Sequence, residues 1–269
     1  MSLEESLARL SAQLPEFERG HVWLAGAGPG AVGCLTLDVV SALSQADAIV
    51  YDALVDPSIL SAAREGAQMH FVGKRGGNRE SARQDDITAL LIHLARENLR
   101  VLRLKGGDPY IFGRGGEEAL SLARAQIPFR ILPGVTSAFG ALAKVGIPAT
   151  MRGFNKAIIL ATGHAVGTDD DLDWAALART GEPIVVYMGL KNLPDIATAL
   201  MAGGLAPSTP VAVIMAATTP VERVLVATLA TVAERADADG FVSPSLIVVG
   251  DIVSMRAELT GIAVEAKSA

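Results

Sequence analysis

The 269-residue sequence has almost no cysteine and few aromatic side chains. Its single cysteine, Cys34, cannot form a disulfide within the chain, which favours the reducing cytoplasm as the compartment. Aromatic residues make up only 4% of the chain, so a core must be built mainly from Ala, Val, Leu and Ile. These residues are typical of buried parallel sheets and of the helices that cover them. The composition therefore favours an α/β protein.

The sequence also lacks a segment that would cross a membrane. Mean hydropathy is positive, at +0.37, but no apolar run reaches the roughly 18 residues that a spanning helix needs. Residues 1–19 are rich in Glu and contain no long apolar stretch, so they do not resemble a signal peptide. We expect a cytoplasmic protein, not bound to a membrane, in which residues 1–19 form an N-terminal extension.

Neither a metal site nor a nucleic-acid surface is indicated. The four histidines are scattered without the spacing of metal ligands, so we expect no metal. The formal net charge of −6 argues against nucleic-acid binding, because phosphate neutralisation needs a basic face. One segment, Gly73–Arg83, departs from this balance, with four basic residues against one glutamate. A solvated loop would explain this charge, but the three glycines in the segment also resemble an anion-binding loop.

Strand and helix signals alternate along the first half of the chain. Short apolar runs predict strands and the segments between them predict helices, which is the pattern of repeated βα crossovers in a parallel sheet. The expected strands cover residues 21–26, 48–51 and 100–104, and the expected helices cover residues 36–45, 85–97 and 117–126.

A second α/β domain is predicted to follow. Pro- and Gly-containing segments at residues 132–137 and 146–148, with a helix of small residues between them, mark the passage between domains. Beyond them we expect strands at 157–161, 183–188, 211–215 and 246–249, a helix at 193–202, and an antiparallel strand at 225–229. The predicted domains are residues 20–135 and 136–269. A cofactor cleft is expected between them, because ligands of α/β folds collect at the carboxyl ends of strands.

The most informative segment is Leu104–Glu118, LKGGDPYIFGRGGEE, which follows a predicted strand. Gly106 and Gly107 let the backbone turn and allow its amides to approach a ligand closely. Pro109 fixes φ and donates no hydrogen bond, so the Asp108 carboxylate sits at a rigid corner. There it could bind a hydroxyl or amine of a ligand, or it could hold the turn. The segment predicts a ligand-holding loop.

A dinucleotide site is a weaker interpretation of the first glycine loop. Gly26–Ala31 fits G-x-G-x-x-A, and Asp52 could pass for the ribose-binding acid. In that fingerprint a helix starts within the glycine run, whereas here Pro29 interrupts the run and helical periodicity resumes only near Thr36. Asp52 also lies later than the usual spacing of about 20 residues. We therefore disfavour a nicotinamide-dependent oxidoreductase.

Eight motifs in a fixed order point elsewhere. They are VWLAGAGPG (22–30), VYDALV (50–55), VGKRGG (72–77), LKGGDPYIFGRGGEE (104–118), PGVTSA (133–138), GIPAT-x-R (146–152), TGH (162–164) and VYMGL (186–190). With this combination, over roughly residues 20–262, the chain resembles the uroporphyrinogen-III C-methyltransferases. These enzymes belong to the tetrapyrrole methylases, also called class III methyltransferases. The resemblance implies the tetrapyrrole methylase fold, with two α/β domains and a cofactor cleft.

The resemblance also implies a reaction. Methyl groups pass from two molecules of S-adenosyl-L-methionine to two pyrrole rings of uroporphyrinogen III, giving precorrin-1 and then precorrin-2, with S-adenosyl-L-homocysteine as the other product. The products serve cobalamin, sirohaem or haem d biosynthesis. Each step is an in-line displacement at a sulfonium methyl, in which alignment supplies much of the acceleration and no metal is needed. A homodimer is expected, as in relatives.

The resemblance further assigns roles to residues. It implies Asp52 as proton acceptor and Lys74 as proton donor. The cofactor-binding positions of the family fall on Pro29, Gly106, Gly107, Asp108, Ile111, Thr136, Ser137, Met188 and Ala217. The acceptor carries eight carboxylates, so its pocket should concentrate side chains that bind anions. Besides Lys74, we expect Arg75, Arg114, Glu117, Arg152 and His164 at the substrate, with Glu117 near the macrocycle or orienting Arg114. Glu118 is expected only to favour a helix N-terminus.

Two departures from the family pattern leave alternatives open. Ala31-Val32 stands where relatives usually have Asp-Pro, and Met151 stands where many have His. If the missing carboxylate positions cofactor or substrate, turnover should be lower than in relatives. The alternatives are another precorrin methyltransferase, an RNA methyltransferase of the same fold, and a catalytically impaired homologue that still binds the cofactor.

Overall fold

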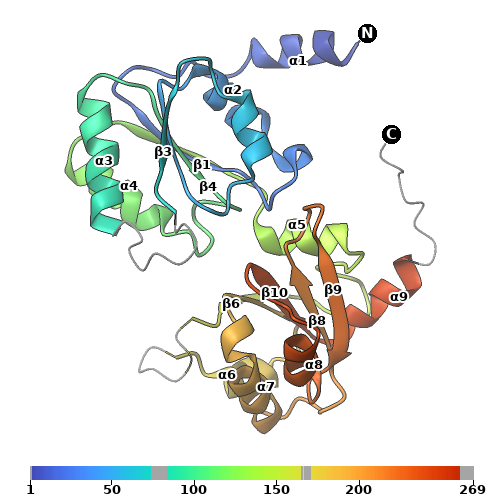
Figure 1. The fold of residues 1–269 in the computed structure, drawn as a ribbon. Coiled ribbons are helices and arrows are strands. Elements are labelled where there is room, and N and C mark those ends of the chain that lie inside the picture. Colours follow the sequence, from blue (N-terminus) through green and yellow to red (C-terminus); the bar gives the residue numbers. More distant parts are fainter. Residues whose placement is uncertain (1, 74–83, 165, 167–170, 261–269) are drawn as a thin grey trace. The chain divides into compact units, whose positions relative to one another are not determined.

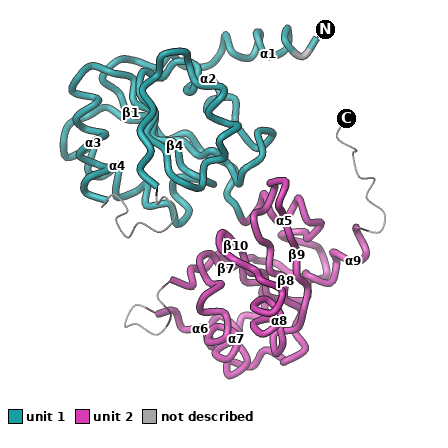
Figure 2. Tube along the Cα trace, in the orientation of Figure 1, with its two compact units in different colours: residues 1–137 teal, residues 138–269 magenta. Residues whose placement is uncertain are grey.

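The computed structural model describes residues 2–73, 84–164, 166 and 171–260. The chain forms two compact units, residues 1–137 and 138–269, each built around a five-stranded sheet (Figures 1 and 2). Helices and strands alternate in both, so the predicted α/β fold class is confirmed. Every helix within the described ranges is too short or too polar to cross a lipid bilayer.

The sheet of unit 1 has five parallel strands in the order β3-β2-β4-β1-β5. These are β1 Val22–Gly26, β2 Ala48–Tyr51, β3 Gln68–Phe71, β4 Val101–Lys105 and β5 Phe129–Leu132. The three predicted strands match β1, β2 and β4 to within a residue. The two edge strands, β3 and β5, were not predicted from the sequence. Both are largely exposed or half-buried and therefore lack the apolar run of a central strand.

Helices cover both faces of this sheet. The helices of the unit are α1 Leu3–Ser11, α2 Leu37–Gln45, α3 Gln84–Arg96 and α4 Gly115–Arg124. Thr36 caps α2 by accepting a hydrogen bond from Val39 N, and the buried face of α2 packs on Leu102 and Leu104. In contrast, α3 and α4 lie side by side and pack against the opposite face through a cluster that includes Val101 (Figure 1).

The connections create a switch point in the strand order. From β1 the chain passes through α2 to β2 on one side, and from β4 it passes through α4 to β5 on the other. Since β1 and β4 are neighbours, a crevice is expected at their carboxyl ends, which is where ligands of open α/β sheets bind.

The sheet of unit 2 is mixed, with the order β6-β7-β10-β8-β9. Its strands are β6 Ile159–Thr162, β7 Ile184–Tyr187, β8 Pro210–Met215, β9 Arg223–Thr228 and β10 Ser245–Val249. Only β6 and β7 pair in parallel, and β9 is antiparallel to β8 as the sequence predicted. Its helices are α5 Ser137–Lys144, α6 Trp174–Arg179, α7 Leu193–Ala202, α8 Val232–Ala238 and α9 Met255–Thr260. One core cluster joins α6, α7 and α8 to the sheet, and another joins α5 and α9 to it.

The Asp47 carboxylate links β2 to β4 at the end of the unit 1 sheet where these strands begin. Asp47, which is 8% exposed, precedes β2. Its Oδ2 accepts hydrogen bonds from Arg100 N and Nε at 3.0 Å, and its Oδ1 accepts one from Arg64 Nη1 at 2.8 Å. The side-chain hydrogen bond from Arg100 outweighs the effect of burial and lowers the pKa of Asp47 from 3.8 to about 2.

Asp47→Asn should therefore destabilise the protein in a pH-dependent way. Because the folded-state pKa lies below the unfolded value, the stabilisation is present above about pH 4 and is lost as the pH falls towards 2. We expect a loss of about 2 kcal/mol in the free energy of unfolding at pH 7, measured by urea titration, and a smaller loss at pH 3.

Asp38→Asn is the matched control for this experiment. Its carboxylate lies 3.8 Å from Arg130 and is more exposed, so the change should cost at most about 1 kcal/mol. A loss in Asp47→Asn that stays the same from pH 7 to pH 3 would contradict the account.

Candidate functional site

Glycines at the carboxyl ends of three neighbouring strands touch one another in unit 1. Gly26 ends β1, Gly107 follows β4 and Gly134 follows β5. A Cβ atom on Gly26 would lie 2.5 Å from Gly107 O and 2.7 Å from Gly134 Cα, which leaves no room for a side chain. Gly28 and Gly107 also exchange two backbone hydrogen bonds, of 3.1 and 2.7 Å. We call Gly26, Gly28, Gly107 and Gly134 the glycine contact.

Asp108 ties two of these loops together. Its Oδ1 accepts a hydrogen bond from Tyr110 N at 2.8 Å, and its Oδ2 accepts one from Gly134 N at 3.0 Å. The carboxylate thus holds the turn, which was the alternative to ligand binding in the sequence analysis. Each oxygen keeps a second lone pair, so this role leaves acceptor capacity for a ligand.

The first glycine loop does not open a helix. A 3-10 turn, Val32–Cys34, separates it from α2, which begins at Leu37. Amides at Gly28 and Gly30 therefore do not form the helix N-terminus that a dinucleotide fingerprint requires. This agrees with the expectation that helical structure resumes only near Thr36.

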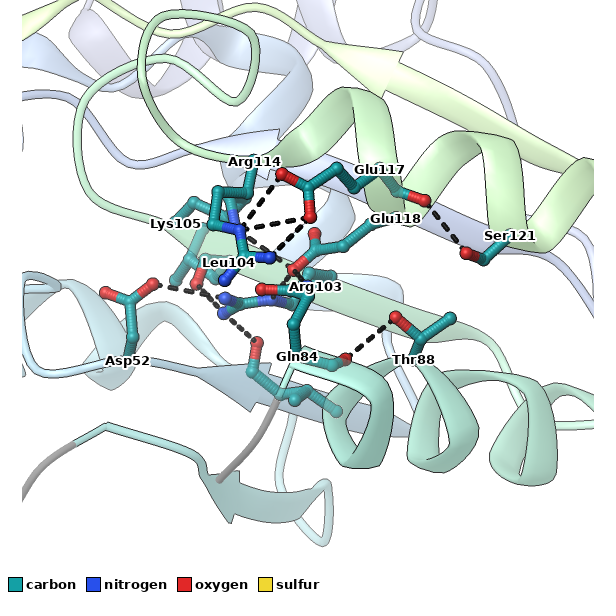
Figure 3. Close-up of polar contacts among 11 residues, drawn as sticks. Asp52, Gln84, Thr88, Arg103, Leu104, Lys105, Arg114, Glu117, Glu118 and Ser121 are labelled. Atoms are coloured by element: carbon teal, nitrogen blue, oxygen red, sulfur yellow. Dashed lines mark hydrogen bonds and ion pairs between the residues drawn. The ribbon is translucent and has the colours of Figure 1, made fainter. Parts of the chain in front are cut away.

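A cluster of charged side chains lies beneath the same edge of the sheet (Figure 3). Arg103 and Lys105 of β4 are 3% and 4% exposed, and Glu118 of α4 is fully buried. Glu118 Oε1 lies 3.2 Å from Arg103 Nε and 3.1 Å from Lys105 Nζ, and Arg103 Nη2 lies 3.2 Å from Asp52 Oδ2. We call Asp52, Arg103, Lys105 and Glu118 the buried ion cluster, in which two cations balance two anions.

The role predicted for Glu118 was incomplete. It lies in the first turn of α4, as expected, but it is also buried against two cations and accepts a further hydrogen bond from Gln84 at 3.0 Å. The available signal was a pair of basic residues at alternate positions of a central strand, because buried cations need a buried anion. Burial and the charge of Arg103 lower the pKa of Lys105, and Glu118 offsets only part of this effect.

The remaining unit 1 residues predicted from the sequence are less tightly held. Arg114 Nε lies 3.1 Å from both oxygens of Glu117, an exposed pair in which this hydrogen bond raises the pKa of Arg114 and lowers that of Glu117. Glu117 is therefore in direct contact with Arg114. Thr136 is buried, Pro29 and Ile111 are half-buried loop residues, and Ser137, also half-buried, begins α5. Lys74 and Arg75 lie outside the described residues.

In unit 2, Met188 and Ala217 lie at one edge of the sheet. Met188 follows β7 and Ala217 follows β8, and the strand between them, β10, aligns Leu246 with both Tyr187 and Ile214. Met188 is 51% exposed and has a φ of 54°, and both neighbours of Ala217 also have positive φ. Such backbone costs of order 1–3 kcal/mol and clusters at functional positions.

The other two unit 2 residues are both exposed. His164 follows β6, which is parallel to β7, so it lies at the same edge as Met188. Arg152 lies in a turn before β6 and not at the carboxyl end of a strand. No group of three or more His, Cys, Asp or Glu side chains suited to a metal ion occurs within the described ranges.

Gly134→Ala tests whether the glycine contact is as tight as described. The new methyl group would meet the backbone at Gly26 and Gly107, so we expect a loss of about 1–3 kcal/mol in the free energy of unfolding. Gly116→Ala is the control, because Gly116 is helical and has nothing within 4 Å of the new Cβ position. It should be neutral or stabilise by up to about 1 kcal/mol. Equal effects in urea titrations would refute the contact.

A family model and two curated proteins match most of this chain. Residues 21–233 match the family described as Tetrapyrrole (Corrin/Porphyrin) Methylases. A uroporphyrinogen-III C-methyltransferase from Sinorhizobium sp is 49% identical over 93% of this chain and 90% of that protein. A siroheme synthase from Neisseria meningitidis serogroup C (strain 053442) is 45% identical over 95% of this chain. The chain spans only 52% of that protein's length.

Solved structures agree with the sequence relatives. The uroporphyrin-III-C-methyltransferase of Thermus thermophilus has a TM-score of 0.74 and 39% identity, over 90% of this chain and 96% of that one. Its complex with S-adenyl homocysteine has a TM-score of 0.73 over 87% of this chain and 99% of that one, at 37% identity. A cobalt precorrin-4 methyltransferase, at 23% identity, shares the fold with a TM-score of 0.79. The chain belongs to the tetrapyrrole methylases.

Proposed function

We propose that this chain transfers methyl groups from S-adenosyl-L-methionine to carbon atoms of two pyrrole rings of uroporphyrinogen III. The products are precorrin-1 and then precorrin-2. The observation that carries the proposal is the 49% identity to a uroporphyrinogen-III C-methyltransferase along 90% of that protein. Glycine loops at the switch point of the unit 1 sheet support it, because this is where α/β folds bind ligands.

The residues at the glycine contact fit the methyl donor. When bound, S-adenosyl-L-methionine would supply a methyl group that an electron-rich pyrrole carbon attacks in line, with S-adenosyl-L-homocysteine leaving as the neutral thioether. A fixed, unbalanced cation beside the positively charged sulfur of the donor would oppose binding. Arg103 and Lys105 lie nearby, but Asp52 and Glu118 balance their charges. By the family resemblance, the cofactor-binding positions are Pro29, Gly106, Gly107, Asp108, Ile111, Thr136 and Ser137 of unit 1, and Met188 and Ala217 of unit 2.

Asp52 is proposed as the proton acceptor. After methyl attack the macrocycle is cationic and must lose a proton, so a nearby carboxylate is useful. Asp52 follows β2, has a side chain that is 24% exposed, and lies at the same edge of the sheet as the glycine contact. Lys74 remains the proposed proton donor, from the family resemblance alone.

The acidic substrate needs basic side chains. Arg114, held by Glu117, can form a bidentate pair with a substrate carboxylate, and Arg152 and His164 are exposed enough to contact a ligand. Arg75 completes the proposed substrate set. We propose a homodimer from the family resemblance alone, and a cytoplasmic location from the single cysteine.

Two other activities remain as competing proposals. The shared fold of the cobalt precorrin-4 methyltransferase favours a later precorrin as an alternative acceptor. Ala31 favours an impaired homologue, because it precedes the 3-10 turn without a side chain that can cap it.

The test is incubation of the purified chain with S-adenosyl-L-methionine and uroporphyrinogen III, followed by mass spectrometry. We expect mass gains corresponding to one and then two added methyl groups. Cofactor binding without any mass gain would contradict the proposal and favour the impaired homologue. Ala31→Asp in the same assay should raise turnover, and unchanged kinetics would show that Ala31 does not impair the enzyme.

A further inference from the structure

We propose that Arg103, itself fixed by Glu118, is a positioning residue that holds the Asp52 carboxylate in place for proton transfer. This inference rests on the proposed function, because it assumes that Asp52 accepts the proton. It extends that function to two buried residues that make no predicted contact with cofactor or substrate. The geometry of the buried ion cluster carries the argument (Figure 3).

The Arg103 guanidinium is fixed by contacts from three elements. Nε donates to Glu118 Oε1 of α4 at 3.2 Å, and Nη1 donates to the carbonyl oxygens of Leu104 in β4 and Val50 in β2 at 3.0 and 3.4 Å. With 3% exposure, the side chain has almost no contact with water. The remaining nitrogen, Nη2, can therefore point in only one direction, which is towards Asp52 at 3.2 Å.

Asp52 is the exposed end of this arrangement. Its Oδ2 accepts from Arg103, and its Oδ1 accepts a hydrogen bond from Leu54 N at 3.1 Å. Each oxygen thus has one fixed donor and one lone pair left to receive a proton. The two contacts define the plane of the carboxylate, and a general base must hold such geometry towards the proton it accepts.

The buried ion cluster has one cation for each carboxylate. Lys105 Nζ lies 3.1 Å from Glu118, which leaves the charge of Arg103 to face Asp52. Three donors converge on Glu118 Oε1, while Oε2 has no hydrogen-bond partner within the described residues. A buried oxygen without a partner is destabilising, and apolar side chains often replace buried ion pairs without loss of stability. An arrangement kept at this cost favours a positioning role.

Arg103→Met removes the guanidinium but keeps an unbranched side chain in the core. We expect kcat to fall by about 10²-fold, as for a misplacement of about 1 Å, while KM for both substrates and the affinity for S-adenosyl-L-homocysteine stay within about threefold. Arg103→Lys keeps the charge but not the planar guanidinium, so its kcat should also fall. This variant replaces Arg103→Met in the assay if Arg103→Met does not fold.

Arg100→Met is the matched control. Arg100 also pairs with an aspartate of the same sheet, but at the opposite, amino-end edge. It should lose stability with kcat unchanged. If Arg100→Met lowers kcat as much as Arg103→Met does, general destabilisation explains both results and the inference fails.

A double-mutant cycle with Asp52→Asn separates positioning from support of the fold. If Arg103 acts through Asp52, adding Arg103→Met to Asp52→Asn should lower kcat no further. Independent losses that multiply would overturn the inference. Full kcat in Asp52→Asn would overturn it as well, together with the assignment of Asp52 as proton acceptor.

A crystal structure of Arg103→Met gives a readout that does not depend on activity. We expect the Asp52 side chain to leave its rotamer and to lose its contact with Leu54 N. An unmoved carboxylate would refute the positioning role even in an active enzyme. If the unsubstituted chain makes no methylated product, the proposed function fails, and this structure still decides whether Arg103 positions Asp52.

Discussion

The close packing of backbone at the ends of β1, β4 and β5 is the constraint on which the candidate site depends. Three glycines meet there, Gly26 and Gly134 have no room for a Cβ atom, and Gly28 and Gly107 are joined by two hydrogen bonds. The three loops that follow these strands are therefore fixed relative to one another before any ligand binds. Asp108 adds a side-chain link between two of them. Preorganised loops of this kind bind a ligand without the entropy cost of ordering them.

The two ends of the unit 1 sheet serve different purposes. At the amino ends, Asp47 and Arg100 join β2 and β4 through charged hydrogen bonds that stabilise the fold. At the carboxyl ends, Arg103 of the buried ion cluster pairs with Asp52, whose side chain is partly exposed. One arginine and aspartate pair thus supports the fold, and the other connects the core to the site. The two pairs have the same chemistry but lie at opposite ends of the sheet. A substitution in one pair therefore serves as a control for a substitution in the other.

Much of the fold followed from the sequence, because central strands and amphipathic helices carry strong periodic signals. The strands β1, β2 and β4 and the antiparallel β9 were predicted close to their observed bounds. The edge strands β3 and β5 were missed, since exposed strands need no apolar pattern. Charges were harder to interpret, because a polar residue in a strand looks solvated until its partner is known. The burial of Glu118 was not predicted for that reason, because its two basic partners lie 13 and 15 positions away in the sequence.

If the loops around the glycine contact bind the methyl donor, hydrogen exchange at their backbone amides should respond to the cofactor product. Exchange of backbone amides would be followed by mass spectrometry with and without saturating S-adenosyl-L-homocysteine, after calorimetry has established that it binds. We expect slower exchange in peptides covering residues 26–30 and 106–111. Binding that leaves exchange in both peptides unchanged, or that protects only peptides elsewhere in the chain, would contradict it.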